Sequence, residues 1–198
     1  SAIIEAAYAD VKQGATNYTA PAGSKDFLQA VIDFYQKKYE LTFQQEQVRA
    51  TVGALHAMYL VMQVLLDPGD EVIIHEPYFS PYREQVVLSG GIPITVPTYE
   101  KNGFQLDVED LKKVITKRTK AIIINSPNNP TGAVFSEETL KQIAKVAIEN
   151  ELFIISDEIY EDFAFTEKFV PMARLAPENT ITISGVSKGF AMTGWRLG

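Results

Sequence analysis

Short, continuous apolar runs recur along this chain and alternate with longer segments of helical periodicity. Two of these runs, in Ala121–Asn125 and Leu152–Ser156, read IIIN and FIIS and are rich in isoleucine. Runs of this kind are typical of strands that are buried on both faces of a parallel sheet. Strands that alternate with helices need right-handed crossover connections. The pattern therefore predicts an α/β protein, a three-layer α/β/α sandwich around a mostly parallel sheet.

The other expected elements follow the same alternation. Asp107 and Ser136 stand where helix N-caps are expected, and acidic residues follow each of them. In the helix before the first expected strand, Phe27, Val31 and Phe34 recur at helical spacing and should face the core. The expected strands are Val48–Val52, Glu71–His75, Ile92–Val96, Ala121–Asn125, Leu152–Ser156 and Thr180–Ser184, and the expected helices are Ala2–Gln13, Ser24–Tyr39, Ala54–Leu66, Pro81–Ser89, Val108–Ile115 and Glu137–Asn150.

Composition argues against several classes of function. The chain has 18 Lys and Arg against 25 Asp and Glu, a net charge of −7, which disfavours a general nucleic-acid binder. It contains no Cys and only two His, His56 and His75, so we expect no thiolate nucleophile, no disulfide and no metal site. No run of 18 apolar residues is present, so we expect no membrane span, and the first residues lack the basic start and apolar run of a signal peptide. Together with the absence of Cys, which fits a reducing compartment, this favours a cytoplasmic protein without membrane association.

Polar and aromatic side chains collect just after the expected strands. In a parallel sheet, ligands bind beyond the carboxyl ends of the strands, so these residues should meet at one edge. They supply a helix N-terminus for an anion, an aromatic ring, an amide, a carboxylate, a phenol, an amine and a guanidinium, a set that suits a phosphorylated aromatic aldehyde. They are found at Gly53–Leu55, Tyr78–Phe79, Ser126–Gly132, Asp157–Tyr160, Ser187–Lys188 and Arg196.

These motifs occur in the order found in one family. The chain resembles the large domain of the fold-type I, pyridoxal-phosphate-dependent aminotransferases of class I/II, and within it the bacterial aspartate or aromatic branch. The resemblance covers nearly all of residues 1–198 and implies an incomplete large domain, with the N-terminal arm and the C-terminal small domain outside the chain. The motifs that carry it are Asn17-Tyr18, Val52–Ala54, Asp67–Val72, Asn-Pro-Thr-Gly at Asn129–Gly132, Asp-Glu-Ile-Tyr at Asp157–Tyr160, and Lys188 with Gly194–Gly198.

The resemblance assigns the catalytic roles to Lys188, Asp157 and Tyr160. Lys188 would hold the aldehyde of pyridoxal 5′-phosphate as a Schiff base and later move the proton from the substrate Cα. Asp157 would pair with the pyridine nitrogen, and Tyr160 would donate to the phenolic oxygen of the cofactor. Asn129, with Asn128 as a weaker candidate, would reach the same oxygen and the substrate carboxylate. Each residue also has a plain structural interpretation, as a solvated lysine, a cap, a core aromatic or a turn residue.

The phosphate of the cofactor needs its own group of donors. Gly53, Ala54 and Leu55 open an expected helix, where free backbone N–H groups favour an anion. Arg196 follows Lys188 at the family's spacing and adds a guanidinium. We expect these residues to form the phosphate site.

Three further contacts with the cofactor are implied by the resemblance. Phe79, or Tyr78 in its place, would stack on the cofactor ring. Many relatives have a serine three residues before the lysine, where this chain has Gly185, so Ser187 is the candidate hydroxyl for the phosphate. Tyr18 would reach the phosphate of the partner subunit in a homodimer.

The resemblance implies an aminotransferase of amino acid metabolism. It would move an amino group between an amino acid, of the aspartate or aromatic type, and a 2-oxo acid in two ping-pong half-reactions. Two alternatives stay open: a carbon–sulfur lyase of the same fold, and an aminotransferase-like effector domain of a regulator. An unrelated nucleotide binder is disfavoured because no Gly-x-Gly-x-x-Gly or Gly-Lys-Ser/Thr loop occurs. The carboxylate-binding arginine of the family lies in its small domain, so we expect the 198-residue chain itself to be inactive.

Overall fold

The computed structural model describes residues 1–165 and 167–198 and divides the chain into two compact units, Ser1–Ala50 and Thr51–Gly198. The first unit is helical. It contains α1 (Ala2–Lys12), α2 (Lys25–Tyr39) and the single-turn helix η1 (Gln45–Gln47).

The buried face of α2 differs from the expected one. Leu28, Ile32 and Tyr35 are buried, whereas Phe27, Val31 and Phe34 are only half-buried. The apolar stripe of this helix is wide enough to include both sets, and spacing alone does not identify its centre. The prediction placed that centre one residue too early.

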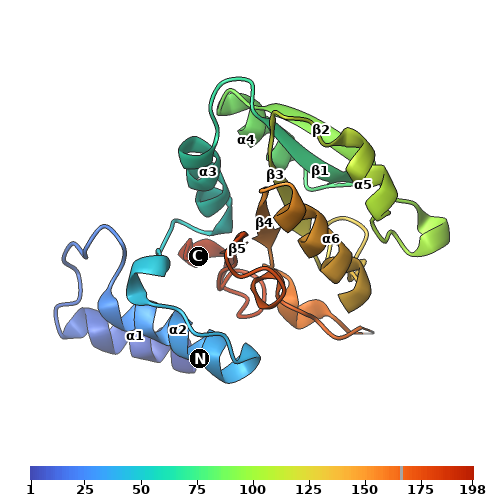
Figure 1. Cartoon of the computed structure of the whole chain (residues 1–198). Helices are drawn as coiled ribbons and strands as arrows, with labels where there is room; N and C mark the ends of the chain where they lie inside the picture. Colours follow the sequence, from blue (N-terminus) through green and yellow to red (C-terminus); the bar gives the residue numbers. More distant parts are fainter. Residues whose placement is uncertain (166) are drawn as a thin grey trace. The chain divides into compact units, whose positions relative to one another are not determined.

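The second unit is built around a five-stranded sheet. Its strands lie in the order β2-β1-β3-β4-β5, and every neighbouring pair is parallel (Figure 1). The strands are β1 (Glu71–Glu76), β2 (Ile92–Pro97), β3 (Thr119–Asn125), β4 (Phe153–Asp157) and β5 (Thr180–Ile183), and the α-helices are α3 (Ala54–Leu65), α4 (Pro81–Leu88), α5 (Val108–Val114) and α6 (Glu137–Glu149). Four single-turn helices, η2 (Glu100–Asn102), η3 (Glu161–Phe163), η4 (Met172–Arg174) and η5 (Thr193–Trp195), lie in the connections.

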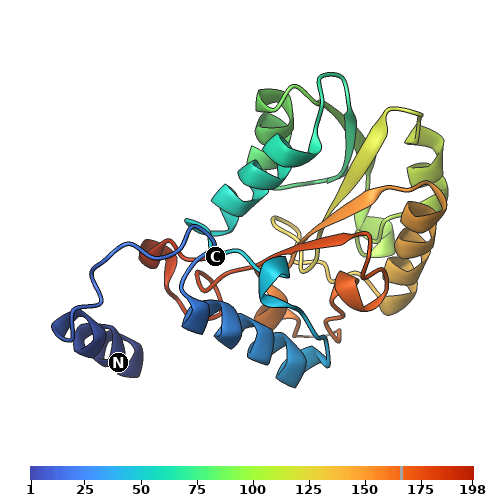
Figure 2. The ribbon, with the colours of Figure 1, turned by 60° about the vertical axis from the view of Figure 1, so that its left-hand side comes forward.

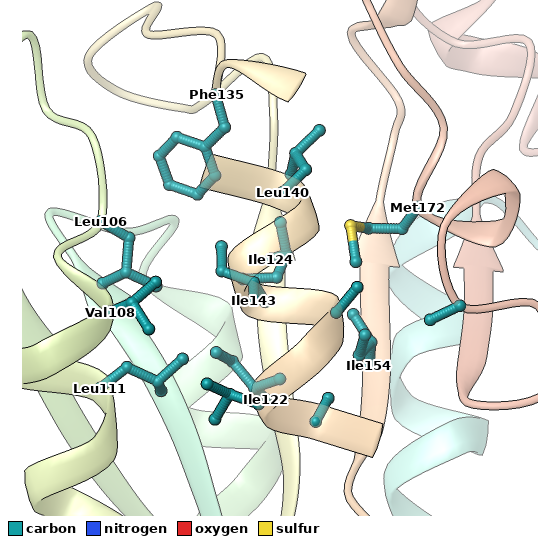
Figure 3. Packing of buried hydrophobic residues seen from close by; sticks show 14 of the residues in the cluster. Leu106, Val108, Leu111, Ile122, Ile124, Phe135, Leu140, Ile143, Ile154 and Met172 are labelled. Atoms are coloured by element: carbon teal, nitrogen blue, oxygen red, sulfur yellow. The ribbon is translucent and has the colours of Figure 1, made fainter. Parts of the chain in front are cut away.

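Helices cover both faces of this sheet, which confirms the three-layer prediction. Strand residues alternate between two buried clusters. Ile122 and Ile154 pack with α5 and α6, whereas Ile123 and Ile155 pack with α3 and α4. Figure 2 shows the two helical layers on opposite sides of the strands, and Figure 3 shows α6 residues such as Ile143 packed over the sheet. Because both faces are covered, the central strands β1, β3 and β4 contain continuous apolar runs rather than alternating ones.

Local sequence signals set the ends of several elements as expected. The Asp107 carboxylate accepts from the Glu109 N–H at 2.9 Å, and the Ser136 hydroxyl accepts from the Thr139 N–H at 3.1 Å, so both residues cap their helices. In the turn before β1, the Asp70 N–H donates to the Asp67 carbonyl at 3.0 Å. For α3–α6 and β1–β5, the predicted bounds agree with the observed ones to within one or two residues.

The predicted strand Val48–Val52 is wrong, because these residues are not in a strand. Thr51 exchanges two backbone hydrogen bonds with Gly198, at 2.7 and 3.1 Å, and this is a single residue pair rather than a ladder. A strand is defined by consecutive pairs with a neighbour, which an apolar run cannot supply by itself.

Candidate active site

The predicted site lies at the carboxyl edge of the parallel sheet. Asp157 and Asn125 are the last residues of β4 and β3, and they are partners in the register of the two strands. Lys188 follows β5 in the loop that leads to η5. The strand order thus brings residues that are far apart in the sequence to one edge, as parallel sheets do.

Asp157 is a buried carboxyl, 7% exposed, with two hydrogen-bond donors. The hydroxyl of Tyr82, on α4, donates to Oδ2 at 2.6 Å, and the Ile159 N–H donates to Oδ1 at 3.2 Å. Burial raises the pKa of Asp157, and the two hydrogen bonds offset only part of this rise. None of the ion pairs among the described residues involves Asp157. Its environment therefore favours a cationic group of a ligand as the missing counter-charge.

The amine and the phenol of the predicted catalytic set lie side by side. Nζ of Lys188 is 5.4 Å from the centre of the Tyr160 ring, within the range of a cation–π contact. The Tyr160 ring in turn meets Phe163 edge-on, with ring centres 6.1 Å apart. Both Lys188 and Tyr160 are half-buried, so each can reach a ligand at this edge.

The start of α3 and the Arg196 guanidinium lie together, as the predicted anion site requires. Gly53 is the N-cap of α3 with φ +83°, and a β-carbon at this position would lie 2.6 Å from Nη2 of Arg196. Arg196 donates from Nη1 to the Thr193 carbonyl at 2.8 Å, which holds the guanidinium beside the helix end. The side chain of Leu55 is exposed, so Leu55 and Ala54 would contribute backbone N–H groups.

The turn after β3 separates the roles of its two asparagines. Asn128 is buried, and its Oδ1 accepts from the N–H and the hydroxyl of Thr131 at 3.2 and 2.8 Å. Asn129 is half-buried, and its backbone N–H donates to Oδ1 of Asn125 at 2.8 Å. No hydrogen bond joins the side-chain amide of Asn129 to the part of the chain that the structure describes. The side chain of Asn128 therefore closes the turn, whereas that of Asn129 has no such task among the described residues.

Phe79 is connected to Asp157 through Tyr82. The Phe79 and Tyr82 rings meet edge-on, 5.6 Å apart at 81°, and Tyr82 donates to the carboxyl. Phe79 and Tyr78 are both half-buried against the cluster under α3 and α4. The structure thus keeps Phe79 beside the site and leaves Tyr78 as its alternative.

The structure says less about the two remaining predicted contact residues, Ser187 and Tyr18. Ser187 is half-buried in the loop before Lys188. A β-carbon at Gly185 would lie 2.9 Å from the Leu197 carbonyl oxygen, so a serine there would need the backbone to shift. Tyr18 belongs to the other unit, Ser1–Ala50, and its side chain is fully exposed.

The two histidines serve structural hydrogen bonds. Nδ1 of His56 accepts from the Val52 N–H at 3.1 Å. His75 is buried, and its Nε2 accepts from the Asn125 N–H at 3.2 Å. Burial lowers the pKa of His75 to about 4, so the ring is neutral at pH 7. Neither ring needs a functional role to explain its position.

Three residues at this edge were given no role by the sequence. Tyr82 stands one helical turn after Phe79, a spacing that could have indicated it. Asn125 ends β3, and Glu158 follows Asp157. Glu158 is 1% exposed, and its Oε1 accepts from the Ser156 hydroxyl and the Met172 N–H at 2.9 and 3.0 Å. Burial raises the pKa of Glu158 to about 8.

Comparisons with known proteins identify the family of the chain. The sequence model of the family "Aminotransferase class I and II" matches residues 1–198. The chain is 42% identical to the aspartate/prephenate aminotransferase of Thermus thermophilus, over 98% of the chain and 50% of that protein. It is 44% identical to the aspartate aminotransferase of Geobacillus stearothermophilus, over 99% of the chain and 51% of that protein.

Solved structures give the same result. The aspartate aminotransferase from Thermus thermophilus with maleate superposes with a TM-score of 0.97 at 42% identity, over 99% of this chain and 51% of that one. The aromatic aminotransferase from Pyrococcus horikoshii has a TM-score of 0.97 at 40% identity, over 99% and 53%. The chain spans about half the length of the curated relatives that it matches. Its sequence, its fold and the residues at the carboxyl edge of its sheet together show that the chain belongs to the class I and II aminotransferase family.

Proposed function

We propose that the complete protein containing these 198 residues transfers an amino group between an amino acid and a 2-oxo acid, with pyridoxal 5′-phosphate as cofactor. The observation that carries the proposal is the position of Lys188, whose amine lies 5.4 Å from the ring centre of Tyr160 at the carboxyl edge of the sheet. The bound cofactor supplies an aldehyde for the amine and a ring that accepts electrons from the substrate Cα. The relatives named aspartate and aromatic aminotransferases support a substrate of the aspartate or aromatic type.

The residues present fit such a cofactor. A β-carbon at position 53 would lie 2.6 Å from Nη2 of Arg196, so the glycine allows the guanidinium to lie against the start of α3, where both can bind an anion. Asp157 is a buried carboxyl, and a protonated ring nitrogen would provide its counter-charge. The distribution of groups thus matches a ligand with an anion at one end and a basic ring nitrogen.

Each side chain then has a stated task. Lys188 would hold the aldehyde carbon of the cofactor as an imine, with loss of water, and once the substrate amine had displaced it the freed amine would move a proton at the substrate Cα. Asp157 keeps the ring nitrogen protonated, and Tyr160 donates a hydrogen bond to the phenolic oxygen. Asn129 reaches the same phenolic oxygen and the substrate carboxylate, and Phe79 covers one face of the ring.

The remaining contacts concern the phosphate and the partner subunit. We propose that the N–H groups of Gly53, Ala54 and Leu55 bind the phosphate together with Arg196 and the Ser187 hydroxyl. Tyr18 reaches the phosphate of the partner subunit in a homodimer. No helix in the described residues is long and apolar enough to cross a membrane, and we place the protein in the cytoplasm. We further propose that residues 1–198 form most of the large domain, with the arm and the small domain outside it, in keeping with the half-length match to the relatives.

The test is covalent mapping in the complete protein. Borohydride reduction after cofactor addition should attach the pyridoxyl group to Lys188, and Lys188→Ala should abolish the label. Lys145→Ala is the matched control, because Lys145 lies on the exposed face of α6. A label on another lysine would overturn the assignment.

A second assay separates the two reactions that this residue set can support. Amino transfer from aspartate or an aromatic amino acid to a 2-oxo acid is the expected activity. Release of pyruvate and ammonia from a cysteine conjugate, without amino transfer, would identify a carbon–sulfur lyase instead.

A further inference from the structure

Asn125 joins three elements of the site through one buried amide. Its side chain is 1% exposed at the end of β3. Nδ2 donates to the Asp157 carbonyl of β4 at 3.0 Å, and Oδ1 accepts from the Asn129 N–H of the following turn at 2.8 Å. Its own N–H donates to Nε2 of His75 on β1 at 3.2 Å. One residue therefore connects the carboxyl ends of β1, β3 and β4.

The polarity of these contacts fixes the orientation of the amide. A carbonyl oxygen can only accept, and a backbone N–H can only donate, so Nδ2 must face Asp157 and Oδ1 must face Asn129. A carboxylate or a leucine has nearly the same shape as asparagine but lacks one or both of these functions. The site therefore requires an asparagine for its hydrogen-bonding pattern and not only for its size.

Most other polar contacts of the turn are internal to it. The Asn128 N–H donates to the Ala133 carbonyl, and the Gly132 N–H donates to the Asn128 carbonyl, at 2.9 and 2.8 Å. These bonds shape the turn but do not fix the position of Asn129 relative to β4. The bond from the Asn129 N–H to Asn125 does so, because the other end of the Asn125 amide is attached to Asp157.

We propose that Asn125 is a positioning residue that sets the placement of Asn129 relative to Asp157, and through it the fit of the cofactor between the turn and β4. This inference rests on the proposed function. Asp157 would bind the ring nitrogen and Asn129 the phenolic oxygen, two groups at a fixed separation on one rigid ring. A rigid ligand is bound tightly only when both contacts are already at the right separation. Because its side chain is buried and both of its polar atoms are bonded within the protein, Asn125 is assigned no direct contact with the cofactor or the substrate.

The experiment compares three variants of the complete protein. Asn125→Asp keeps the size and the acceptor but loses the donor toward Asp157, and Asn125→Leu loses both functions. Asn179→Asp is the matched control: Nδ2 of Asn179 donates to the Leu152 carbonyl at 3.0 Å, the same kind of bond at the opposite end of β4. For each variant we would measure the apparent dissociation constant of pyridoxal phosphate, the free energy of unfolding of the cofactor-free protein, and hydrogen–deuterium exchange of the peptide that spans residues 126–133.

The expected results separate positioning from general stability. Asn125→Asp should raise the dissociation constant about tenfold or more, as expected for one lost buried hydrogen bond, with exchange in the turn close to wild type. Asn125→Leu should also speed exchange of the turn. Asn179→Asp should lower the free energy of unfolding but leave the dissociation constant within about twofold of wild type.

Two outcomes would overturn the inference. One is an Asn125→Asp protein that loses as much stability as the control while its dissociation constant stays within about twofold of wild type. The other is an Asn125→Leu protein in which the peptide that spans residues 126–133 exchanges hydrogen for deuterium at the wild-type rate. If that variant does not fold, the test depends on Asn125→Asp alone. A wild-type protein that does not bind pyridoxal phosphate would refute the proposed function instead, and the exchange data would still report on the anchoring of the turn.

Discussion

At the level of single residues, the hydroxyl of Tyr82 is the side-chain donor to the buried carboxyl of Asp157. Tyr82→Phe removes this donor without changing the packing of the ring. We expect the free energy of unfolding to fall by about 1–2 kcal/mol, because a buried carboxyl loses a partner, and the pKa of Asp157 to rise further. Urea unfolding of the complete protein measures the first effect, and binding of pyridoxal phosphate should weaken as well.

The matched control is Tyr59→Phe, on α3, where the tyrosine is half-buried and its hydroxyl forms no hydrogen bond with the described residues. Equal effects of the two substitutions on stability and on cofactor binding would mean that the Tyr82 hydroxyl has no special role.

Glu158 makes the stability of the protein depend on pH. Burial raises its pKa from 4.5 to about 8, and the charges of Glu161 and Asp157 add to the rise. The folded state therefore retains a proton that the unfolded state releases, so the contribution of Glu158 to stability is fully present below about pH 4.5 and is lost as the pH rises toward about 8. Glu158→Gln should remove this part of the slope. Unfolding free energies at a series of pH values measure it.

The control for this titration is Glu178→Gln, because Glu178 is exposed. It should leave the slope unchanged. A Glu158→Gln protein with the wild-type slope between pH 5 and 8 would show that Glu158 is ionised in the folded protein.

The residues proposed to touch a cofactor could be picked out from the sequence, whereas the residues that hold those side chains in place could not. Asp157, Tyr160 and Lys188 follow strands directly, and strand ends meet in a parallel sheet, so their grouping could be foreseen. Tyr82 and Asn125 act through neighbours 75 and 32 residues away in the chain. Such pairs arise from packing in three dimensions, which one sequence without relatives does not reveal.

At the level of elements, buried isoleucine runs identified β3 and β4 because both of their faces are covered. The same reasoning failed for Val48–Val52, since a strand also depends on what lies beside it, and Thr51 pairs only with Gly198. Spacing identified α2 as a helix but missed the centre of its buried face by one residue. Patterns along the chain thus predict whether a segment is a helix or a strand more reliably than they predict which other segments lie beside it.

The junction between Gly53 and α3 offers a test at this scale. Gly53→Ala would force φ +83° on a residue with a side chain and place a methyl group 2.6 Å from Nη2 of Arg196. We expect a loss of about 1–3 kcal/mol of unfolding free energy, and weaker binding of pyridoxal phosphate because the guanidinium is displaced. Binding of pyridoxal, which lacks the phosphate, should change less.

Gly103→Ala is the matched control for backbone strain. Gly103 has φ +65°, but a β-carbon there would have no atom within 4 Å. The control should lose stability without losing cofactor affinity. If both variants bind pyridoxal phosphate equally well, Gly53 serves only the turn.

At the level of the whole molecule, we expect the 198-residue chain by itself to fold but not to catalyse amino transfer. Two buried clusters line the faces of its sheet, which is enough for a cooperative unfolding transition. The family resemblance places the arginine that binds the substrate carboxylate beyond Gly198, and orientation of a substrate supplies roughly 7–11 kcal/mol in favourable cases. Thermal unfolding and an assay with aspartate or aromatic amino acids test both statements. Turnover close to that of the complete protein would show that the substrate site lies within these residues.

The two hydrogen bonds between Thr51 and Gly198 bring the first and the last residue of the second unit together. In residues 51–198 taken alone, the two ends of the chain would therefore be neighbours, and such ends can be joined. A short linker between residues 198 and 51 would complete the circle, and new ends could be made in the exposed turn at Glu100–Asn102 between β2 and α5. The sheet would keep its strand order β2-β1-β3-β4-β5 in that circular permutant, because the strand pairings do not depend on where the circle is cut.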